Sequence, residues 1–350
     1  MSKFATTEEL HHNNISSKNI DYFCDKDKME KYIKKIYPQF YENFELNNFI
    51  KRGAGYIYKG KCKYNNQKYV FKICIKEKRT KKKKEETQEI SIIKKLHHKN
   101  ITQIVEFVKM DENTYMSIFQ YEKHGDLNNF VKNILKREIL SETCINYFAK
   151  QILDSLEYIH RCKIVHFDLK PENIIVDSNL TIKINDFSSS ISYSESNPED
   201  LVTFPFVGTG KYMSPEIIKR SHMNNKYAQK IDIYSFGVTL YYLTFGKYPY
   251  QLNDILSKDY EKILEKIKSV NLEFPQEVNI SEKFKDFLSK ILEKDYLKRI
   301  NIKEALEHPW IKGADIIIDE KEKVSYQEQF LFRLINDNIP EFNEYIKIKS

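Results

Sequence analysis

Residues 166–173 read His-Phe-Asp-Leu-Lys-Pro-Glu-Asn, and this stretch carries most of the information about the fold. Within it, Asp168, Lys170 and Asn173 supply an acid, a cation and an amide at short fixed spacings. Thirteen residues after Asn173 comes a second short string, Asp186-Phe187-Ser188. A lone Asp or Asn in a loop is usually a turn former. Oxygen ligands repeated in this order beside a lysine instead indicate a site for divalent cations and phosphate groups.

The composition places the chain among globular proteins. It has 350 residues, of which 41% are hydrophobic and 31% are charged, so it can bury a sizeable core. The formal net charge of +7 is modest at this length and does not by itself indicate nucleic-acid binding. No apolar run approaches the roughly 18 residues of a membrane span, and the N-terminus lacks the apolar core of a signal peptide.

The cysteines bear on the cellular compartment. All five are scattered and none forms a CxxC pair, which argues against a disulfide framework or a zinc site. We therefore expect a reducing compartment and a cytoplasmic protein. The run of seven Lys/Arg between Lys76 and Lys84 is typical of a solvated linker, and it leaves a nuclear address open.

Strands are predicted mainly in the first third of the chain. Aromatic and β-branched residues favour strands at 49–50, 56–58 and 69–74, and Asn65-Asn66 predicts a turn before the last of them. Two more extended segments are expected at 101–108 and 115–119.

Helices are predicted mainly in the remainder. Apolar spacing favours helices at 89–96 and along a stripe from Ile145 to Ile159, and the segment 231–243 is apolar nearly all round, as in a buried helix. Strands followed by helices predict an α+β fold.

The two polar strings resemble protein kinases, whose catalytic loop has the pattern H-R-D-L-x-x-x-N and whose metal-binding segment reads D-F-G. The resemblance runs in order from about Phe44 to Ile311. It implies a two-lobed fold, with a sheet-rich lobe at 43–121 and a larger helical lobe at 122–313. It also implies transfer of the ATP γ-phosphate to a hydroxyl of a protein substrate, with Mg²⁺ as the metal.

The resemblance assigns the chemistry to five residues. Asp168 would orient the substrate hydroxyl and accept its proton, and Lys170 would stabilise the transferring phosphoryl group. Thr209 would bond both of these side chains. Asn173 and Asp186 would hold two Mg²⁺ ions through oxygen atoms.

The segment 208–216, Gly-Thr-Gly-Lys-Tyr-Met-Ser-Pro-Glu, resembles serine/threonine kinases rather than tyrosine kinases, as does the Lys-Pro-Glu-Asn at 170–173. The resemblance implies three structural residues: Glu216 with its partner Arg299, and the buried Asp232. His-Pro-Trp-Ile at 308–311 is similar to the calmodulin-dependent kinase group.

ATP binding is expected chiefly from the sheet-rich lobe. Lys72, in a stretch similar to V-A-I-K, would hold the α- and β-phosphates, with Glu89 as its partner. Asp126 would contact the ribose, although a helix N-cap is an equally good interpretation. The other expected contacts come from the Gly-rich loop, the neighbouring strands and the hinge between the lobes: Gly53, Gly55, Ile57, Val70, Phe119, Gln120 and Glu122.

The Gly-rich loop departs from the family pattern. Ile50 and Arg52 occupy the first two glycine positions, and only Gly55 takes its place in the pattern. Because backbone amides approach phosphates most closely where side chains are absent, this departure puts ATP affinity in doubt. Arg52 could add a cation to the phosphates.

The activation segment departs as well. Phe167 replaces the arginine that binds a phosphate in many kinases, and Pro205 stands at the usual phosphorylated position. We infer that activity does not depend on phosphorylation there, with Thr203 and the serines from Ser188 to Ser196 remaining as other sites. Ser188 replaces the last glycine of D-F-G, which would cost on the order of 1 kcal/mol if that position needs a positive φ.

The sequence leaves undecided the roles of the two terminal segments and the choice among three functions. An extension at 1–42, with a helix expected at 27–37, either packs on the kinase or regulates it. A tail at 314–350, with apolar residues at helical spacing, either docks on the body or serves in autoinhibition or partner binding. The rivals to a serine/threonine protein kinase are a pseudokinase that acts as a scaffold and a small-molecule kinase of similar fold.

Overall fold

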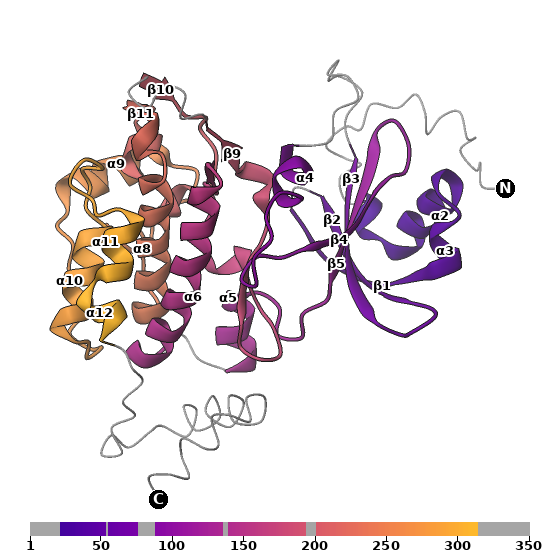
Figure 1. Cartoon of the computed structure of the whole chain (residues 1–350), viewed down its shortest axis with the longest axis horizontal. Coiled ribbons are helices and arrows are strands. Elements are labelled where there is room, and N and C mark those ends of the chain that lie inside the picture. Colours follow the sequence, from indigo (N-terminus) through magenta and orange to yellow (C-terminus); the bar gives the residue numbers. More distant parts are fainter. Residues whose placement is uncertain (1–21, 54, 76–87, 136–138, 194–200, 314–350) are drawn as a thin grey trace, which may run out of the picture. The chain divides into compact units, whose positions relative to one another are not determined.

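The computed structural model describes residues 22–53, 55–75, 88–135, 139–193 and 201–313 (Figure 1). These fall into two compact units. Unit 1 runs to Glu86 and includes Gln103–Tyr121, and unit 2 holds Thr87–Thr102 and the chain from Glu122 onward. The basic run after Ile75, the two candidate phosphorylation sites Ser194 and Ser196, and the C-terminal tail lie outside the described residues.

Unit 1 is built on one antiparallel sheet of five strands in the order β1-β2-β3-β5-β4. The predicted strands are confirmed, and Asn66 has the left-handed φ of 57° in the turn between the second and the third. The bounds are β1 (Phe44–Arg52), β2 (Tyr56–Cys62), β3 (Lys68–Ile75), β4 (Ile104–Lys109) and β5 (Thr114–Gln120).

Two helices of the N-terminal extension cover one face of this sheet, α2 (Lys26–Ile36) and α3 (Phe40–Asn43) (Figure 1). The predicted helix is therefore confirmed. Its buried Met29 and Ile33 join Phe40 in one apolar cluster with sheet residues Tyr56, Tyr58, Phe71, Ile73, Met116 and Ile118. The described part of the extension is a packing element of unit 1.

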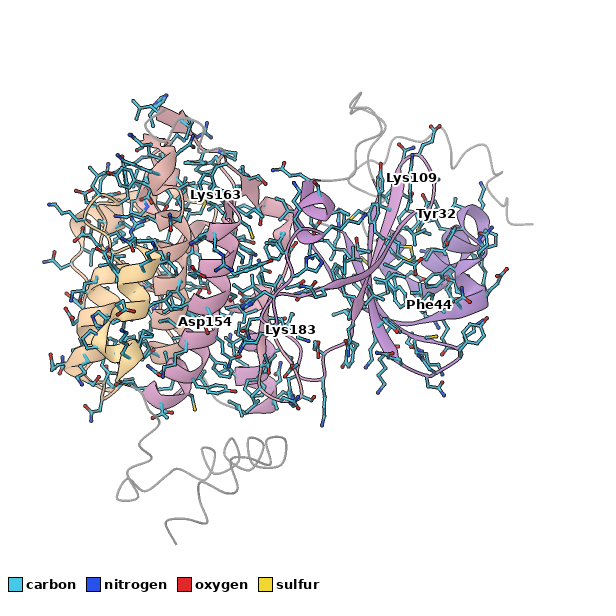
Figure 2. The ribbon with its side chains drawn as sticks, in the orientation of Figure 1. Tyr32, Phe44, Lys109, Asp154, Lys163 and Lys183 are labelled. Atoms are coloured by element: carbon cyan, nitrogen blue, oxygen red, sulfur yellow. The ribbon has the colours of Figure 1, made fainter. Side chains whose placement is uncertain are left out.

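Hydrogen bonds cap α2 and hold the extension at a defined position on the sheet. The Asp25 side chain caps α2 by accepting from the Lys28 amide at 3.1 Å. The Tyr58 hydroxyl donates to the Phe23 carbonyl at 2.6 Å. Tyr32, labelled in Figure 2, places its hydroxyl 2.6 Å from the hydroxyl of Thr114 at the start of β5.

Unit 2 is mainly helical, and its centre is α8 (Lys230–Phe245). Fifteen of the sixteen residues of α8 are buried, as the all-round apolar sequence predicts, and the helix ends at Gly246 with φ 64°. The other helices are α4 (Gln88–Ile93), α5 (Leu127–Asn129), α6 (Glu142–Arg161), α7 (Pro215–Ile218), α9 (Tyr260–Ser269), α10 (Glu282–Ile291), α11 (Ile302–Glu307) and α12 (Pro309–Lys312).

Three small two-stranded sheets shape the loops of unit 2, and local sequence patterns predict none of them. They pair β6 (Ile164–Val165) with β9 (Ile191–Ser192), β7 (Ile174–Val176) with β8 (Ile182–Ile184), and β10 (Leu201–Thr203) with β11 (His222–Asn224). Among the described residues, no helix is long and apolar enough to cross a bilayer.

Candidate active site

Three predicted catalytic side chains form a closed triangle of hydrogen bonds in unit 2. The Thr209 hydroxyl donates to Asp168 Oδ1 at 2.7 Å, and Lys170 Nζ donates to Asp168 Oδ2, also at 2.7 Å. Lys170 Nζ lies 2.5 Å from Thr209 Oγ1, which closes the triangle. Asp168 and Lys170 keep 13% and 19% of their side-chain surface exposed, so a substrate can reach the carboxylate.

The two predicted metal ligands are joined by the β7–β8 hairpin. Ile174 pairs with Ile184, and just before and after them the Asn185 amide donates to the Asn173 carbonyl at 2.9 Å. Asn173 Nδ2 donates to Asp168 Oδ2 at 3.0 Å and to its carbonyl at 2.8 Å. Since the amide nitrogen of Asn173 is committed to Asp168, its oxygen is the atom suited to a cation.

Asp232 anchors the catalytic loop from below. It is fully buried, and its carboxylate accepts the backbone N–H groups of His166 and Phe167, each at 2.9 Å. His160 Nε2 lies 2.9 Å from the same carboxylate. Burial raises the pKa of Asp232, but the hydrogen bond and charge of His160, followed by those of His166, hold it below its usual value.

The comparisons with known proteins agree with this geometry. The model of the protein kinase domain matches residues 45–311. The chain belongs to the protein kinase family. It is of the eukaryotic serine/threonine type, as the names of its relatives indicate, and none of these findings favours the pseudokinase scaffold.

The curated relatives differ in length from this kinase. It is 32% identical over 248 residues to a cell cycle serine/threonine-protein kinase of Saccharomyces cerevisiae, covering 71% of this chain and 33% of that one. It is 32% identical over 277 residues to myosin light chain kinase A of Dictyostelium discoideum, covering 77% and 88%. It is 30% identical over 260 residues to the mouse serine/threonine-protein kinase ULK3, covering 73% and 52%. The chain thus spans from a third to most of the length of these relatives.

The predicted structural pair of the kinase, Glu216 and Arg299, is buried. Arg299 donates to Glu216 through both terminal nitrogens, at 2.7 and 3.0 Å, and the two residues are 1% and 3% exposed. Arg299 also donates to the carbonyls of Lys230 and Glu293. This bidentate pair ties α7, at the end of the activation segment, to the loop before α11.

In unit 1, four of the predicted ATP contacts share one face of the sheet. Lys72 lies directly opposite Ile57, and Val70 lies opposite Phe119. Lys72 is 7% exposed. Because side chains alternate along a strand, Phe71 points to the other face, where the N-terminal helices pack.

Close packing requires a glycine at one position of the Gly-rich turn, Gly55. A Cβ atom on Gly55 would approach Cys74 Sγ to 2.7 Å and the Ile73 carbonyl to 2.8 Å, so this position must stay small to lie on β3. A Cβ atom on Gly53 would meet nothing within 4 Å. Arg52 lies over the Tyr56 ring, 5.7 Å from its centroid.

The remaining predicted nucleotide contacts lie in different surroundings. Gln120 is the exposed last residue of β5. Glu122, in unit 2, pairs with Lys183, which Figure 2 labels. Asp126 accepts the Asn129 amide at 2.9 Å and so caps α5, as its alternative interpretation proposed. Glu89 lies in the first turn of α4, also in unit 2.

The condition attached to Ser188, a positive φ, is not met. Ser188 lies in a short 3₁₀ helix, Phe187–Ser189, and its φ is not positive. The left-handed residue is instead Asp186, with φ 60°, and Phe167 has a φ of 67°. Serine in place of glycine therefore imposes no penalty of that kind, because the backbone turns two residues earlier.

His160 was not among the predicted site residues. It lies within the apolar stripe of α6, where an unpaired polar group would be costly, and its position there could have indicated a buried partner.

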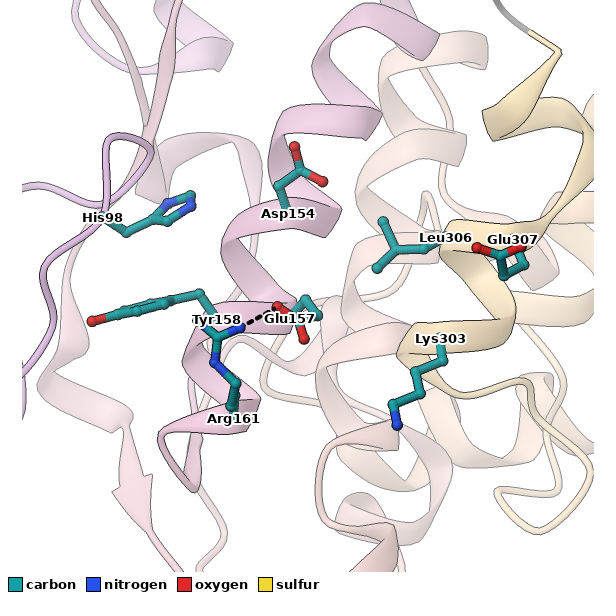
Figure 3. Close-up of a pocket in the computed structure, with 8 residues that line it drawn as sticks. All are labelled: His98, Asp154, Glu157, Tyr158, Arg161, Lys303, Leu306 and Glu307. Carbon is teal, nitrogen blue, oxygen red and sulfur yellow. Dashed lines mark ion pairs between the residues drawn. The ribbon is translucent and has the colours of Figure 1, made fainter.

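A surface pocket lies away from these residues. Figure 3 shows it between α6 and α11, with His98 beside the ring of Tyr158 and Arg161 paired with Glu157. None of the predicted catalytic or metal-binding residues lines it.

Proposed function

We propose that this chain is an active kinase that transfers the γ-phosphate of ATP to serine or threonine hydroxyls of protein substrates. The observation that carries the proposal is the triangle of Asp168, Lys170 and Thr209. Its members come from two segments about 40 residues apart. Thr209 donates to one carboxylate oxygen of Asp168 and Lys170 donates to the other, while the bond between Lys170 and Thr209 holds these two donors together. Such preorganisation is what positioning a substrate hydroxyl requires.

In the proposed reaction the substrate hydroxyl oxygen attacks the γ-phosphorus, and the bond from that phosphorus to the β-phosphate oxygen breaks. Asp168 takes the hydroxyl proton. Lys170 Nζ, held on Asp168 and Thr209, lies beside that carboxylate and can neutralise charge on the phosphoryl oxygens. Lys72 would hold the α- and β-phosphates as a point charge.

The residues present fit a magnesium requirement. Asn173 directly precedes β7 and Asp186 follows β8 by two residues, so the open end of this hairpin carries both oxygen ligands. Among the described residues, no group of three His, Cys, Asp or Glu side chains forms a cage of protein ligands alone. Mg²⁺ is commonly held by one or two carboxylates together with substrate phosphates, whose charge it neutralises.

An assay with γ-labelled ATP and generic protein substrates tests the proposal. We expect label on serine and threonine after acid hydrolysis, and loss of incorporation when a chelator removes Mg²⁺. Label on tyrosine alone, or equal incorporation by Asp168→Asn, would contradict it, since equal incorporation indicates a contaminating kinase.

We also propose a cytoplasmic location. Its support is that none of the five cysteines forms a disulfide, as expected where thiols stay reduced. Imaging of the tagged full chain would test this, and secretion or export to an oxidising compartment would contradict it.

A further inference from the structure

The activation segment is here defined as residues 201–213. Phe204 is a buried side chain between two exposed residues of this segment. Its neighbours Thr203 and Pro205 are exposed, whereas Phe204 is 8% exposed. Its ring packs on the ring of Phe167, with centroids 5.7 Å apart and planes inclined by 52°. Phe167 itself is 2% exposed and directly precedes Asp168. An aromatic contact thus links the activation segment to the catalytic loop.

The backbone of Phe167 is held firmly enough to act as the fixed side of this contact. Its N–H donates to the buried Asp232 carboxylate at 2.9 Å, and its φ of 67° is a conformation that a bulky residue adopts only when its surroundings impose it. On the activation segment, a Cβ atom at Gly208 would come within 2.5 Å of the Phe167 carbonyl. Gly208, with φ 109°, therefore lies directly on the same residue.

The contacts of Phe167 with Phe204 and Gly208 lie next to the catalytic triangle in the sequence. Phe167 is one residue from Asp168, and Gly208 is one residue from Thr209. The Thr209–Asp168 hydrogen bond therefore depends on the segment lying against Phe167. Phe204 supplies the apolar burial that favours this placement.

Other residues hold the segment on different partners. Phe206 packs edge-on against Tyr260, with centroids 4.6 Å apart, and Arg220 lies over the Phe206 ring. Lys211 Nζ donates to the Asn253 carbonyl at 2.8 Å. The segment is thus held on α9 and its preceding loop by one aromatic residue and on the catalytic loop by another, two positions apart.

We propose that Phe204 is a positioning residue for phosphoryl transfer: packed on Phe167, it keeps Thr209 on Asp168 and Lys170 without a phosphate on the segment. The inference rests on the proposed kinase function. It assigns to an aromatic contact the ordering that an arginine and a phosphorylated residue would otherwise provide, since Phe167 cannot bind a phosphate and Pro205 cannot carry one.

The test is a double-mutant cycle on the full chain after phosphatase treatment, with the absence of segment phosphate checked by mass spectrometry. We expect Phe204→Ala to lower kcat at least about tenfold, equivalent to about 1.4 kcal/mol of barrier, with little change in ATP affinity. Phe167→Ala should do the same, and the double variant should be no worse than either single variant. Phe204→Leu, which keeps the space filled, should recover most of the activity.

The matched control is Phe206→Ala, an aromatic truncation two residues away that faces Tyr260. Its effect on kcat should add to that of Phe167→Ala, because the ring of Phe206 packs on Tyr260 whereas the ring of Phe167 packs on Phe204. If an alanine variant does not fold, a second cycle with Phe204→Val and Phe167→Val serves, because valine removes the ring but keeps part of the buried volume. Wild-type kcat in Phe204→Ala, or additive effects of Phe204 and Phe167 in either cycle, would overturn the inference while leaving the kinase assignment intact. A wild-type chain that transfers no phosphate would overturn the proposed function, and this inference with it.

Discussion

The two units of this kinase are stabilised by different interactions. Beneath the sheet of unit 1, Met29, Ile33 and Phe40 fill a cluster made of apolar and aromatic side chains. In unit 2 the corresponding interactions are buried charges. Asp232, under the catalytic loop, is fully buried, and Arg299, the partner of Glu216, is 1% exposed. Apolar packing is non-directional and tolerates replacement by residues of similar volume. Hydrogen-bonded charges fix direction, and they tolerate the loss of a partner poorly.

The difference explains where catalytic precision resides. The Asp232 carboxylate aims two backbone N–H groups of the loop that carries Asp168, which an apolar residue could not do. The N-terminal helices need only cover a sheet face. We therefore expect substitutions to separate the two regions by size of effect and by tolerance of conservative replacements.

The largest effect on stability is expected for Asp232→Ala. It would leave the amides of His166 and Phe167 buried without their acceptor and His160 without its partner. We expect a loss of about 3–5 kcal/mol in the free energy of unfolding. Urea denaturation at constant slope measures it. Asp232→Asn, which keeps the shape, should lose less, and wild-type stability of the alanine variant would disprove the anchoring role.

A slightly smaller effect is expected at the pair of Glu216 and Arg299. Removing either partner alone, by Glu216→Leu or Arg299→Met, should cost about 3 kcal/mol, because the other charge stays buried and unpaired. The double variant should cost clearly less than the sum. A double-mutant cycle by chemical denaturation gives the coupling energy. Strict additivity would show that the pair is not a unit.

In unit 1 the loss of stability should depend on how much buried side-chain volume a substitution removes. Met29→Ala should lower the free energy of unfolding by about 2–4 kcal/mol, since Met29 is fully buried. Met29→Leu should lower it by less than about 1.5 kcal/mol. Thermal denaturation of both variants tests this. Equal losses for the two would mean that the cluster is as exacting as the charged region.

The smallest effect is a pH dependence from Asp232. Its pKa in the folded chain lies below its usual value, so its contribution to stability is fully present above the unfolded pKa of about 3.9. That contribution is lost as the pH falls through the folded pKa. Stability below about pH 4 should therefore fall more steeply in the wild type than in Asp232→Asn. Parallel acid-unfolding curves would contradict the assignment.

Much of the fold could be predicted from local patterns. Alternating aromatic and β-branched residues located β2 and β3, and the apolar composition of 231–243 located the buried α8. These succeed because a strand or a helix repeats its burial pattern within a few residues. The order of the polar strings likewise located the segments that meet at Asp168.

What the sequence did not reveal depends on partners far along the chain. The two-residue strands β6 and β9 have no periodicity of their own and form only because their partners lie beside them. The left-handed φ lies at Asp186 and not at Ser188, and the three residues Asp186-Phe187-Ser188 carry no local sign of this. The contact of Phe167 with Phe204 spans residues that no local rule connects.

The most direct test of the account measures Asp168→Asn for both phosphoryl transfer and ATP binding. The asparagine keeps the size of the side chain and the contacts with Thr209, but it cannot accept a proton. We expect kcat to fall by about 10²–10⁴ while ATP affinity stays unchanged. Wild-type kcat in this variant, or an equal loss of transfer and of ATP affinity, would contradict the role of Asp168 as the proton acceptor.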